Sequence, residues 1–126
     1  MKHRILLIED NEQNRYLATF LLERRGHEIA CASDGPAGIA RAAQFRPDLI
    51  LLDIQLPGLD GYAVARELRR NPDLRAIPIV AVTSYAMPGD REKALAAGCT
   101  GYIEKPIDPD TFADEVERLG ARKDPA

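Results

Sequence analysis

The chain has 126 residues, of which 45% are hydrophobic and 29% are charged, and its formal net charge is −3. These values are typical of one globular domain. They argue against a basic nucleic-acid-binding surface, and no apolar run approaches the roughly 20 residues that a membrane-spanning helix needs. The N-terminal stretch MKHRILLIED lacks a signal-peptide pattern, so a cytoplasmic protein is expected.

Short apolar runs alternate with longer stretches of helical periodicity along the chain. The predicted strands are residues 4–8, 28–32, 49–53, 77–83 and 101–105. The predicted helices run from an Asn11 cap to Gly26, over 36–44, 62–70 and about 89–97, and from Pro109 behind an Asp108 cap. One domain over 1–121 is expected, followed by a frayed tail over 122–126.

The first and last predicted helices carry apolar residues at a spacing of three and four. This spacing predicts inner stripes made of Leu17, Phe20 and Leu21 in the first helix and of Phe112, Val116 and Leu119 in the last.

The cysteines and histidines show no metal-ligand spacing. Cys31 and Cys99 are therefore predicted to be small, reduced core residues, and His3 and His27 to be surface residues.

Five strand–helix units in strict alternation predict an α/β fold, with a doubly wound parallel sheet and helices on both faces. In such sheets, ligands bind beyond the carboxyl ends of the strands, where the strand order reverses. This rule directs attention to the residues that follow each predicted strand.

Polar residues stand at the carboxyl ends of four predicted strands: Glu9 and Asp10, Asp53, Thr83, and Lys105. If the first and third strands are neighbours, as in the flavodoxin-like order 2-1-3-4-5, three carboxylates meet in one crevice and repel one another. A divalent cation with oxygen ligands relieves this repulsion, and Mg²⁺ suits a site with few carboxylates and a phosphate.

Each of these residues also has a purely structural interpretation. Asp10 could cap the first helix, and the Lys105–Pro106 pair could be only a turn. Five polar groups at the ends of four strands are hard to obtain by accident, so the joint interpretation as a site is favoured.

One set of motifs covers essentially the whole chain: Glu9-Asp10, Asp53 followed by Pro57-Gly58, Thr83, and Lys105-Pro106. Together they resemble the CheY-like receiver domain of response regulators. The resemblance implies a role in two-component phosphorelay signalling, in which Asp53 accepts a phosphoryl group from a phosphohistidine. It also implies Mg²⁺ bound by Asp10 and Asp53, with help from Glu9 and the backbone carbonyl of Gln55.

The same resemblance implies a switch. Lys105 would neutralise charge on the phosphoryl group, and Thr83 would donate a hydroxyl hydrogen bond to it. Tyr102 would turn inward when Thr83 moves, although it could instead be a static cover on its strand. The Lys105–Pro106 peptide is expected to be cis.

The sequence departs from the commonest family pattern at Ser84, where alanine is more usual, and this leaves the lifetime of the phosphorylated state open. Gln55 and Tyr85 are expected to border the same opening and to tune the attack of water.

The expected partners are a histidine kinase or a histidine phosphotransfer protein, and a downstream protein. The downstream protein would bind the face formed by the helix at 89–97, the strand at 101–105 and the last helix. The chain would be a monomer or weak dimer that catalyses its own phosphorylation and dephosphorylation without being a turnover enzyme.

Two alternatives remain. The initial Met and short tail favour a stand-alone regulator, but a receiver excised from a hybrid histidine kinase would look similar. A Mg²⁺-dependent aspartyl-phosphate phosphohydrolase is disfavoured, because such enzymes typically carry a second Asp where this chain has Gln55.

Overall fold

The computed structural model describes residues 3–56, 58, 60–84 and 88–121. The strands are β1 (Arg4–Ile8), β2 (Glu28–Ala32), β3 (Leu49–Asp53), β4 (Ile79–Thr83) and β5 (Gly101–Glu104). The helices are α1 (Glu12–Glu23), α2 (Gly35–Phe45), α3 (Gly61–Arg70), α4 (Asp90–Ala96) and α5 (Phe112–Gly120), with a 3₁₀ turn, η1 (Pro72–Leu74), after α3. The expected tail over 122–126 lies outside the described residues.

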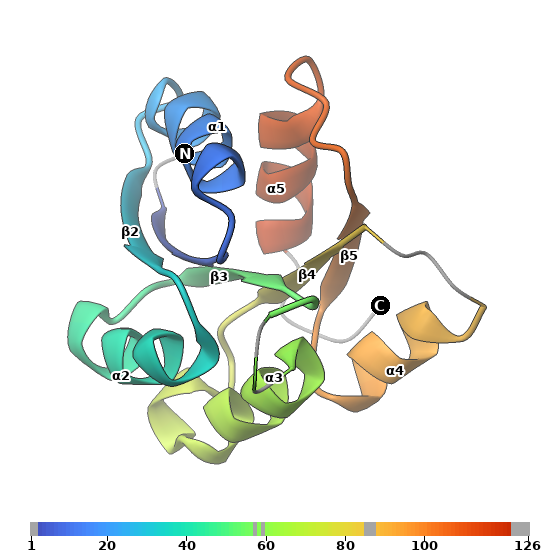
Figure 1. Ribbon diagram of the computed structural model, residues 1–126. Coiled ribbons are helices and arrows are strands. Elements are labelled where there is room, and N and C mark those ends of the chain that lie inside the picture. Colours follow the sequence, from blue (N-terminus) through green and yellow to red (C-terminus); the bar gives the residue numbers. More distant parts are fainter. Residues whose placement is uncertain (1–2, 57, 59, 85–87, 122–126) are drawn as a thin grey trace.

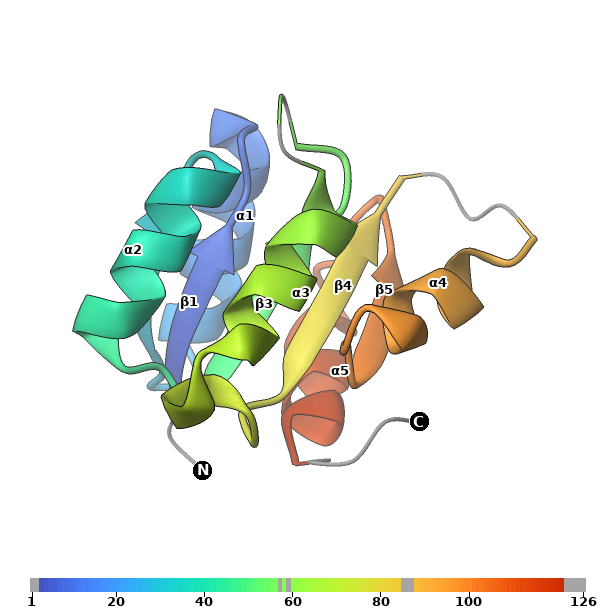
Figure 2. The same cartoon turned by 90° about the horizontal axis from the view of Figure 1, so that it is seen from below.

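All neighbouring strands pair in parallel, in the order β2-β1-β3-β4-β5. Helices α1 and α5 cover one face of the sheet, and α2, α3 and α4 cover the other (Figure 1). Figure 2, seen from the side of α2, α3 and α4, shows these three helices in front of the strands. The predicted doubly wound fold and its strand order are confirmed.

Two hydrophobic cores fill the space between the sheet and its two helical layers. In β1, Leu6 and Ile8 belong to the core under α2, α3 and α4, whereas Ile5 and Leu7 belong to the core under α1 and α5. Every residue of β3 and β4 is buried, because these central strands are covered on both faces. This burial explains the unbroken apolar run that precedes Asp53.

The inner face of α1 differs from the prediction. Its buried residues are Ala18 and Leu22, whereas Phe20 is 47% exposed. Phe20 stacks on Tyr16, with 6.3 Å between the ring centroids, and the Arg24 guanidinium lies over its ring. Placing Phe20 in the inner stripe was therefore wrong, because the stripe of α1 that packs on the core runs through Ala18 and Leu22.

Two predicted boundaries also shift. Helix α5 begins at Phe112 rather than Pro109, because the Asp108 carbonyl accepts hydrogen bonds from the amides of Thr111 and Phe112 and closes a turn first. Strand β4 begins at Ile79, after Pro78, which has no amide to donate to the sheet.

The cysteines and histidines are only partly as expected. Both cysteines are free, and Cys99 is buried as predicted, but Cys31, on the edge strand β2, is exposed. His27 is not a surface residue: its ring is buried, Nδ1 accepts the His3 amide, and Nε2 lies 2.8 Å from Oε2 of Glu117. The two ends of this imidazole are satisfied by partners distant in sequence.

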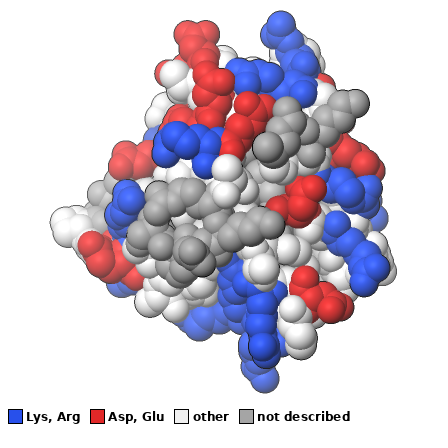
Figure 3. All heavy atoms as spheres, turned by 180° about the vertical axis from the view of Figure 1, so that it is seen from behind, with Lys and Arg blue, Asp and Glu red and all other residues white. Residues whose placement is uncertain are grey.

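Charges of both signs are interspersed on the face drawn in Figure 3. Within the described part of the chain, no helix has the length and hydrophobicity required to cross a membrane.

Candidate functional site

The strand register brings the predicted polar residues to one edge of the sheet. Ile8 of β1 pairs with Leu52 of β3, so Glu9 and Asp53 follow at the same level. Thr83 of β4 pairs with Glu104 of β5, and Lys105 comes next. Because all five strands are parallel, their carboxyl ends meet at this edge, which is where ligands bind in open α/β sheets.

Three carboxylates converge at this edge. Oxygen atoms of Glu9, Asp10 and Asp53 all lie within 4.8 Å of one another. Glu9 and Asp53 are only 3% and 2% exposed, whereas Asp10 is open to solvent. An all-oxygen donor set with one open side is the arrangement that suits a hard divalent cation carrying several waters.

Lys105 supplies the positive charge next to this cluster. Its Nζ lies 2.8 Å from Oε1 of Glu9 and 3.3 Å from Oδ2 of Asp53. Burial lowers the pKa of Lys105, but hydrogen bonds to and charges on Glu9 and Asp53 together outweigh it and raise the pKa above its ordinary value. Lys105 therefore stays positively charged at the bottom of the site.

Glu9 carries the clearest electrostatic signature of the site. Burial, opposed by Lys105 and reinforced by Asp53, raises the pKa of Glu9 to about 7. Without a metal ion, the Glu9 carboxyl group binds a proton far more readily than a carboxyl group in water does. The site therefore favours the binding of a positive ion, which would offset the repulsion among the three carboxylates.

The loop after β3 fixes the orientation of Asp53. Oδ1 of Asp53 accepts a hydrogen bond from the Gln55 amide at 2.9 Å, while Oδ2 faces Lys105. The loop closes where the Gly61 amide donates to the Ile54 carbonyl. A Cβ on Gly61 would lie 2.5 Å from Cα of Ile54, so only glycine permits this approach. Pro57 of the expected turn lies outside the described residues.

Thr83 ends β4 as a buried residue, and its side chain contacts Gln55. The sequence indicates Gln55 only as a backbone ligand and as a border of the opening. Nε2 of Gln55 donates a hydrogen bond to Oγ1 of Thr83, and the Ser84 amide donates to Oε1 of Gln55 at 2.9 Å. No spacing rule in the sequence could have found this bridge, because it joins two separate loops. Tyr85, the other residue expected at this opening, is not among the described residues.

Arg15 is a second contact that the sequence did not indicate. Its Nη1 donates to the Glu9 carbonyl at 2.8 Å, which ties α1 to the end of β1.

Tyr102 lies on β5, partly buried, and packs against the core beneath α3 and α4. Burial and the nearby charges of Asp90 and Glu104 raise the pKa of its hydroxyl. The Lys105 amide donates to the Thr83 carbonyl at 2.7 Å, and the Lys105–Pro106 peptide is cis. A backbone link thus runs from Thr83 to the loop that carries Lys105.

Comparison with known protein families gives one match. The model of the response regulator receiver domain matches residues 5–117.

Among curated relatives, the polar-differentiation response regulator DivK of Brucella anthropi is 40% identical over 117 residues. The alignment covers 93% of this chain and 95% of that protein. DivK of Brucella ovis is 39% identical over the same length.

Solved structures agree. The chemotaxis protein CheY4 of Vibrio cholerae superposes with a TM-score of 0.89 at 26% identity, covering 94% of this chain and 99% of that one. The receiver domain of the sensor histidine kinase PA1611 from Pseudomonas aeruginosa has a TM-score of 0.85 at 35% identity, covering 97% and 100%. That structure holds a magnesium ion in its active-site cleft. With the family match across most of its length and the same fold, this chain belongs to the response-regulator receiver family.

Proposed function

We propose that this protein is a phosphorelay receiver in which Asp53 accepts a phosphoryl group from a phosphohistidine. The observation that carries the proposal is the buried Asp53 carboxylate, held between Lys105 and two further carboxylates at the carboxyl edge of the sheet. A buried acid with a fixed cation and an open, acidic side is suited to binding a metal and a phosphoryl group together.

The donor set fits Mg²⁺. Asp10 and Asp53 would hold the ion directly, Glu9 would support it, and the backbone carbonyl of Gln55 would complete the protein ligands. When bound, Mg²⁺ would neutralise charge on the transferring phosphoryl group. The cluster of oxygen atoms within 4.8 Å and the raised pKa of Glu9 support this assignment.

In the transfer, a carboxylate oxygen of Asp53 attacks phosphorus and forms an acyl phosphate. The nitrogen–phosphorus bond of the donor breaks at the same centre, and its electron pair returns to the imidazole nitrogen. Lys105, 3.3 Å from Asp53, would then pair with a phosphoryl oxygen. Such catalysis is mostly positioning and electrostatic stabilisation, which this preformed edge can supply.

Thr83 would respond to the phosphoryl group by donating a hydrogen bond from its hydroxyl group to a phosphoryl oxygen. Tyr102, on the neighbouring strand β5 and packed against the same core as α4, would turn inward in response. A switch of this kind needs two arrangements whose populations the phosphoryl group biases.

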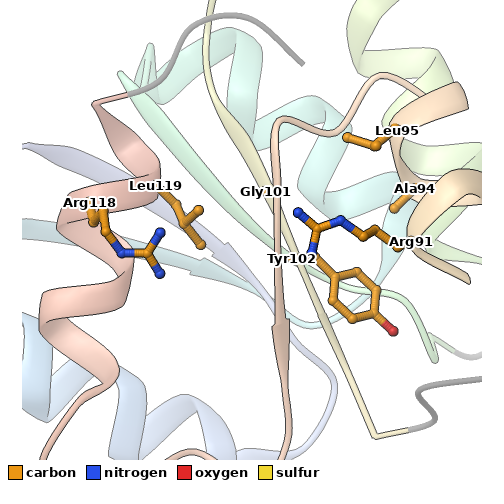
Figure 4. A pocket seen from close by; sticks show the side chains of 7 residues that line it. All are labelled: Arg91, Ala94, Leu95, Gly101, Tyr102, Arg118 and Leu119. Atoms are coloured by element: carbon orange, nitrogen blue, oxygen red, sulfur yellow. The ribbon is translucent and has the colours of Figure 1, made fainter. Parts of the chain in front are cut away.

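We infer that the signal leaves through the face formed by α4, β5 and α5. Figure 4 shows Arg91 of α4 and Arg118 of α5 extending from opposite sides towards β5, where Gly101 and Tyr102 line the same hollow. Tyr102 belongs to this face, so a rotation of its ring would change the shape of the face. Its partner would be a downstream protein rather than a nucleic acid.

The protein would act as a phosphoacceptor that catalyses its own phosphorylation and dephosphorylation, not as a turnover enzyme. A dedicated phosphohydrolase is disfavoured by Gln55, which offers no carboxyl group to act as acid or base. The 35% identity to the receiver domain of a sensor histidine kinase supports the alternative that this domain works within a hybrid kinase.

The proposal is tested with phosphoramidate, a small donor whose phosphorus–nitrogen bond resembles that of phosphohistidine. Intact-protein mass spectrometry should show one added phosphoryl group with Mg²⁺ and almost none when EDTA removes the ion. Equal labelling under both conditions would overturn the role of the metal, and no labelling under either would overturn the function.

A further inference from the structure

The Gln55 side chain connects the two loops that border the phosphoacceptor. It belongs to the loop after β3, two residues beyond Asp53, and it reaches the last residue of β4 and the first residue after it. One amide group therefore contacts both the side chain of Thr83 and the backbone of Ser84.

The orientation of this amide is fixed by its partners. The Ser84 amide can only donate, so Oε1 of Gln55 must face it, at 2.9 Å. This leaves Nε2 of Gln55 to donate to Oγ1 of Thr83. The Thr83 hydroxyl oxygen is thereby engaged as an acceptor by a group on the opposite loop.

The backbone of the same residue is bound to the phosphoacceptor. The Gln55 amide donates to Oδ1 of Asp53 at 2.9 Å. Gln55 therefore contacts Asp53 through its main chain and Thr83 through its side chain. It lies between the two residues whose separation would change when Thr83 moves towards a phosphoryl group on Asp53.

From these contacts we propose that the Gln55 side chain is a positioning residue that holds Thr83 and Ser84 in the unphosphorylated arrangement. This inference rests on the function proposed above. If Thr83 moves towards a phosphoryl group, its hydroxyl loses the hydrogen bond from Nε2 of Gln55. The backbone amide of Ser84, the next residue, then either moves with Thr83 and loses Oε1 of Gln55 as its acceptor, or the Gln55 side chain moves as well. The bridge thus opposes activation and sets the population of the active state before phosphorylation.

The size of the effect follows from the bonds involved. The net contribution of a neutral hydrogen bond is modest, because both groups bind water instead when the bond breaks. Removing the bridge should therefore tighten the binding of an activating phosphoryl mimic about three- to tenfold.

The test compares wild-type protein with Gln55→Met, which keeps the side-chain length and the main-chain carbonyl but removes both side-chain hydrogen bonds. Gln55→Ala serves as a second variant. Gln44→Met is the matched control, because Gln44 is exposed on α2. Each protein is titrated with beryllofluoride in the presence of Mg²⁺, and the amide signals of Thr83 and Ser84 are followed by NMR.

The expected result has two parts. Both Gln55 variants bind beryllofluoride about three- to tenfold more tightly than wild type, while the Gln44 variant is unchanged. Without beryllofluoride, their Thr83 and Ser84 signals lie displaced from the wild-type positions towards the bound positions. A Gln55 residue with a merely structural role would lower thermal stability without moving these signals along that line.

Two outcomes would overturn the inference in distinguishable ways. If wild type binds beryllofluoride and both Gln55 variants bind it equally or more weakly, the bridge does not oppose activation, and the proposed function stands. If wild type itself binds no beryllofluoride with Mg²⁺, the proposed function fails and this inference fails with it.

Discussion

Nζ of Lys105 lies 3.3 Å from Oδ2 of Asp53, although Asp53 ends β3, Lys105 follows β5, and β4 lies between these two strands in the sheet. The side chain of Lys105 therefore crosses the carboxyl end of β4 to reach the carboxylate. Both side chains are largely buried, at 11% and 2% exposure, so little water screens the pair. The attraction between the two charges is therefore stronger than it would be on the surface.

Replacing Asp10 by alanine should separate metal binding from folding. Asp10 is the exposed member of the carboxylate cluster, so its loss should remove one proposed metal ligand and leave the core intact. Without metal, the variant should be as stable as wild type or more stable, because one of three repelling charges is gone. Thermal melts with and without Mg²⁺ measure this, and a metal-induced rise in melting temperature as large as that of wild type would contradict it.

The pH dependence of the free energy of unfolding should show the titration of the Glu9 carboxyl group. Burial raises the pKa of Glu9 from 4.5 to about 7, so the folded, metal-free protein binds this proton more tightly than the unfolded chain does. The contribution of Glu9 to stability is therefore fully present below about pH 4.5. It is lost as the pH rises to about 7 and is constant above that.

Glu9→Gln provides the control, because an amide cannot titrate. Between about pH 4.5 and 7, the melting temperature of metal-free wild type should fall relative to that of the variant. Parallel curves for the two proteins would show that Glu9 does not titrate in this window.

Activation should change α4 more than α3. Helix α4 has seven residues, follows Gly89, which provides no side-chain cap, and buries only Ala94, so its local stability is expected to be low. Helix α3 has an Asp60 cap and buries four residues of its inner face. Beryllofluoride with Mg²⁺ should therefore shift the amide signals of residues 83–84 and 88–102 more than those of α3. Changes confined to residues that touch Asp53 would rule out the proposed output face.

The fold could be predicted from the sequence because its determinants are local and repeated. Short apolar runs alternate with helical periodicity, and the continuous run before Asp53 is what a strand covered on both faces requires. The boundaries were less predictable. Helix α5 starts at Phe112 because a turn at Asp108 competes with the cap that the sequence suggests.

The site was predictable in its membership and not in its side-chain contacts. The position of Glu9, Asp53 and Lys105 at strand ends follows from chain order and parallel pairing alone. The Gln55 bridge to Thr83 and the burial of His27 against Glu117 depend on side chains from separate elements. No spacing of residues in the sequence predicts either contact.

The central claim is that Asp53 is the phosphoacceptor, and Asp53→Asn tests it most directly. The amide keeps the shape of the side chain but is not a nucleophile. Wild type treated with acetyl phosphate and Mg²⁺ should gain one phosphoryl group that hydroxylamine removes, as expected of an acyl phosphate. Asp53→Asn, with a circular dichroism spectrum like that of wild type, should gain none. Labelling of this folded variant to the wild-type extent would contradict the account.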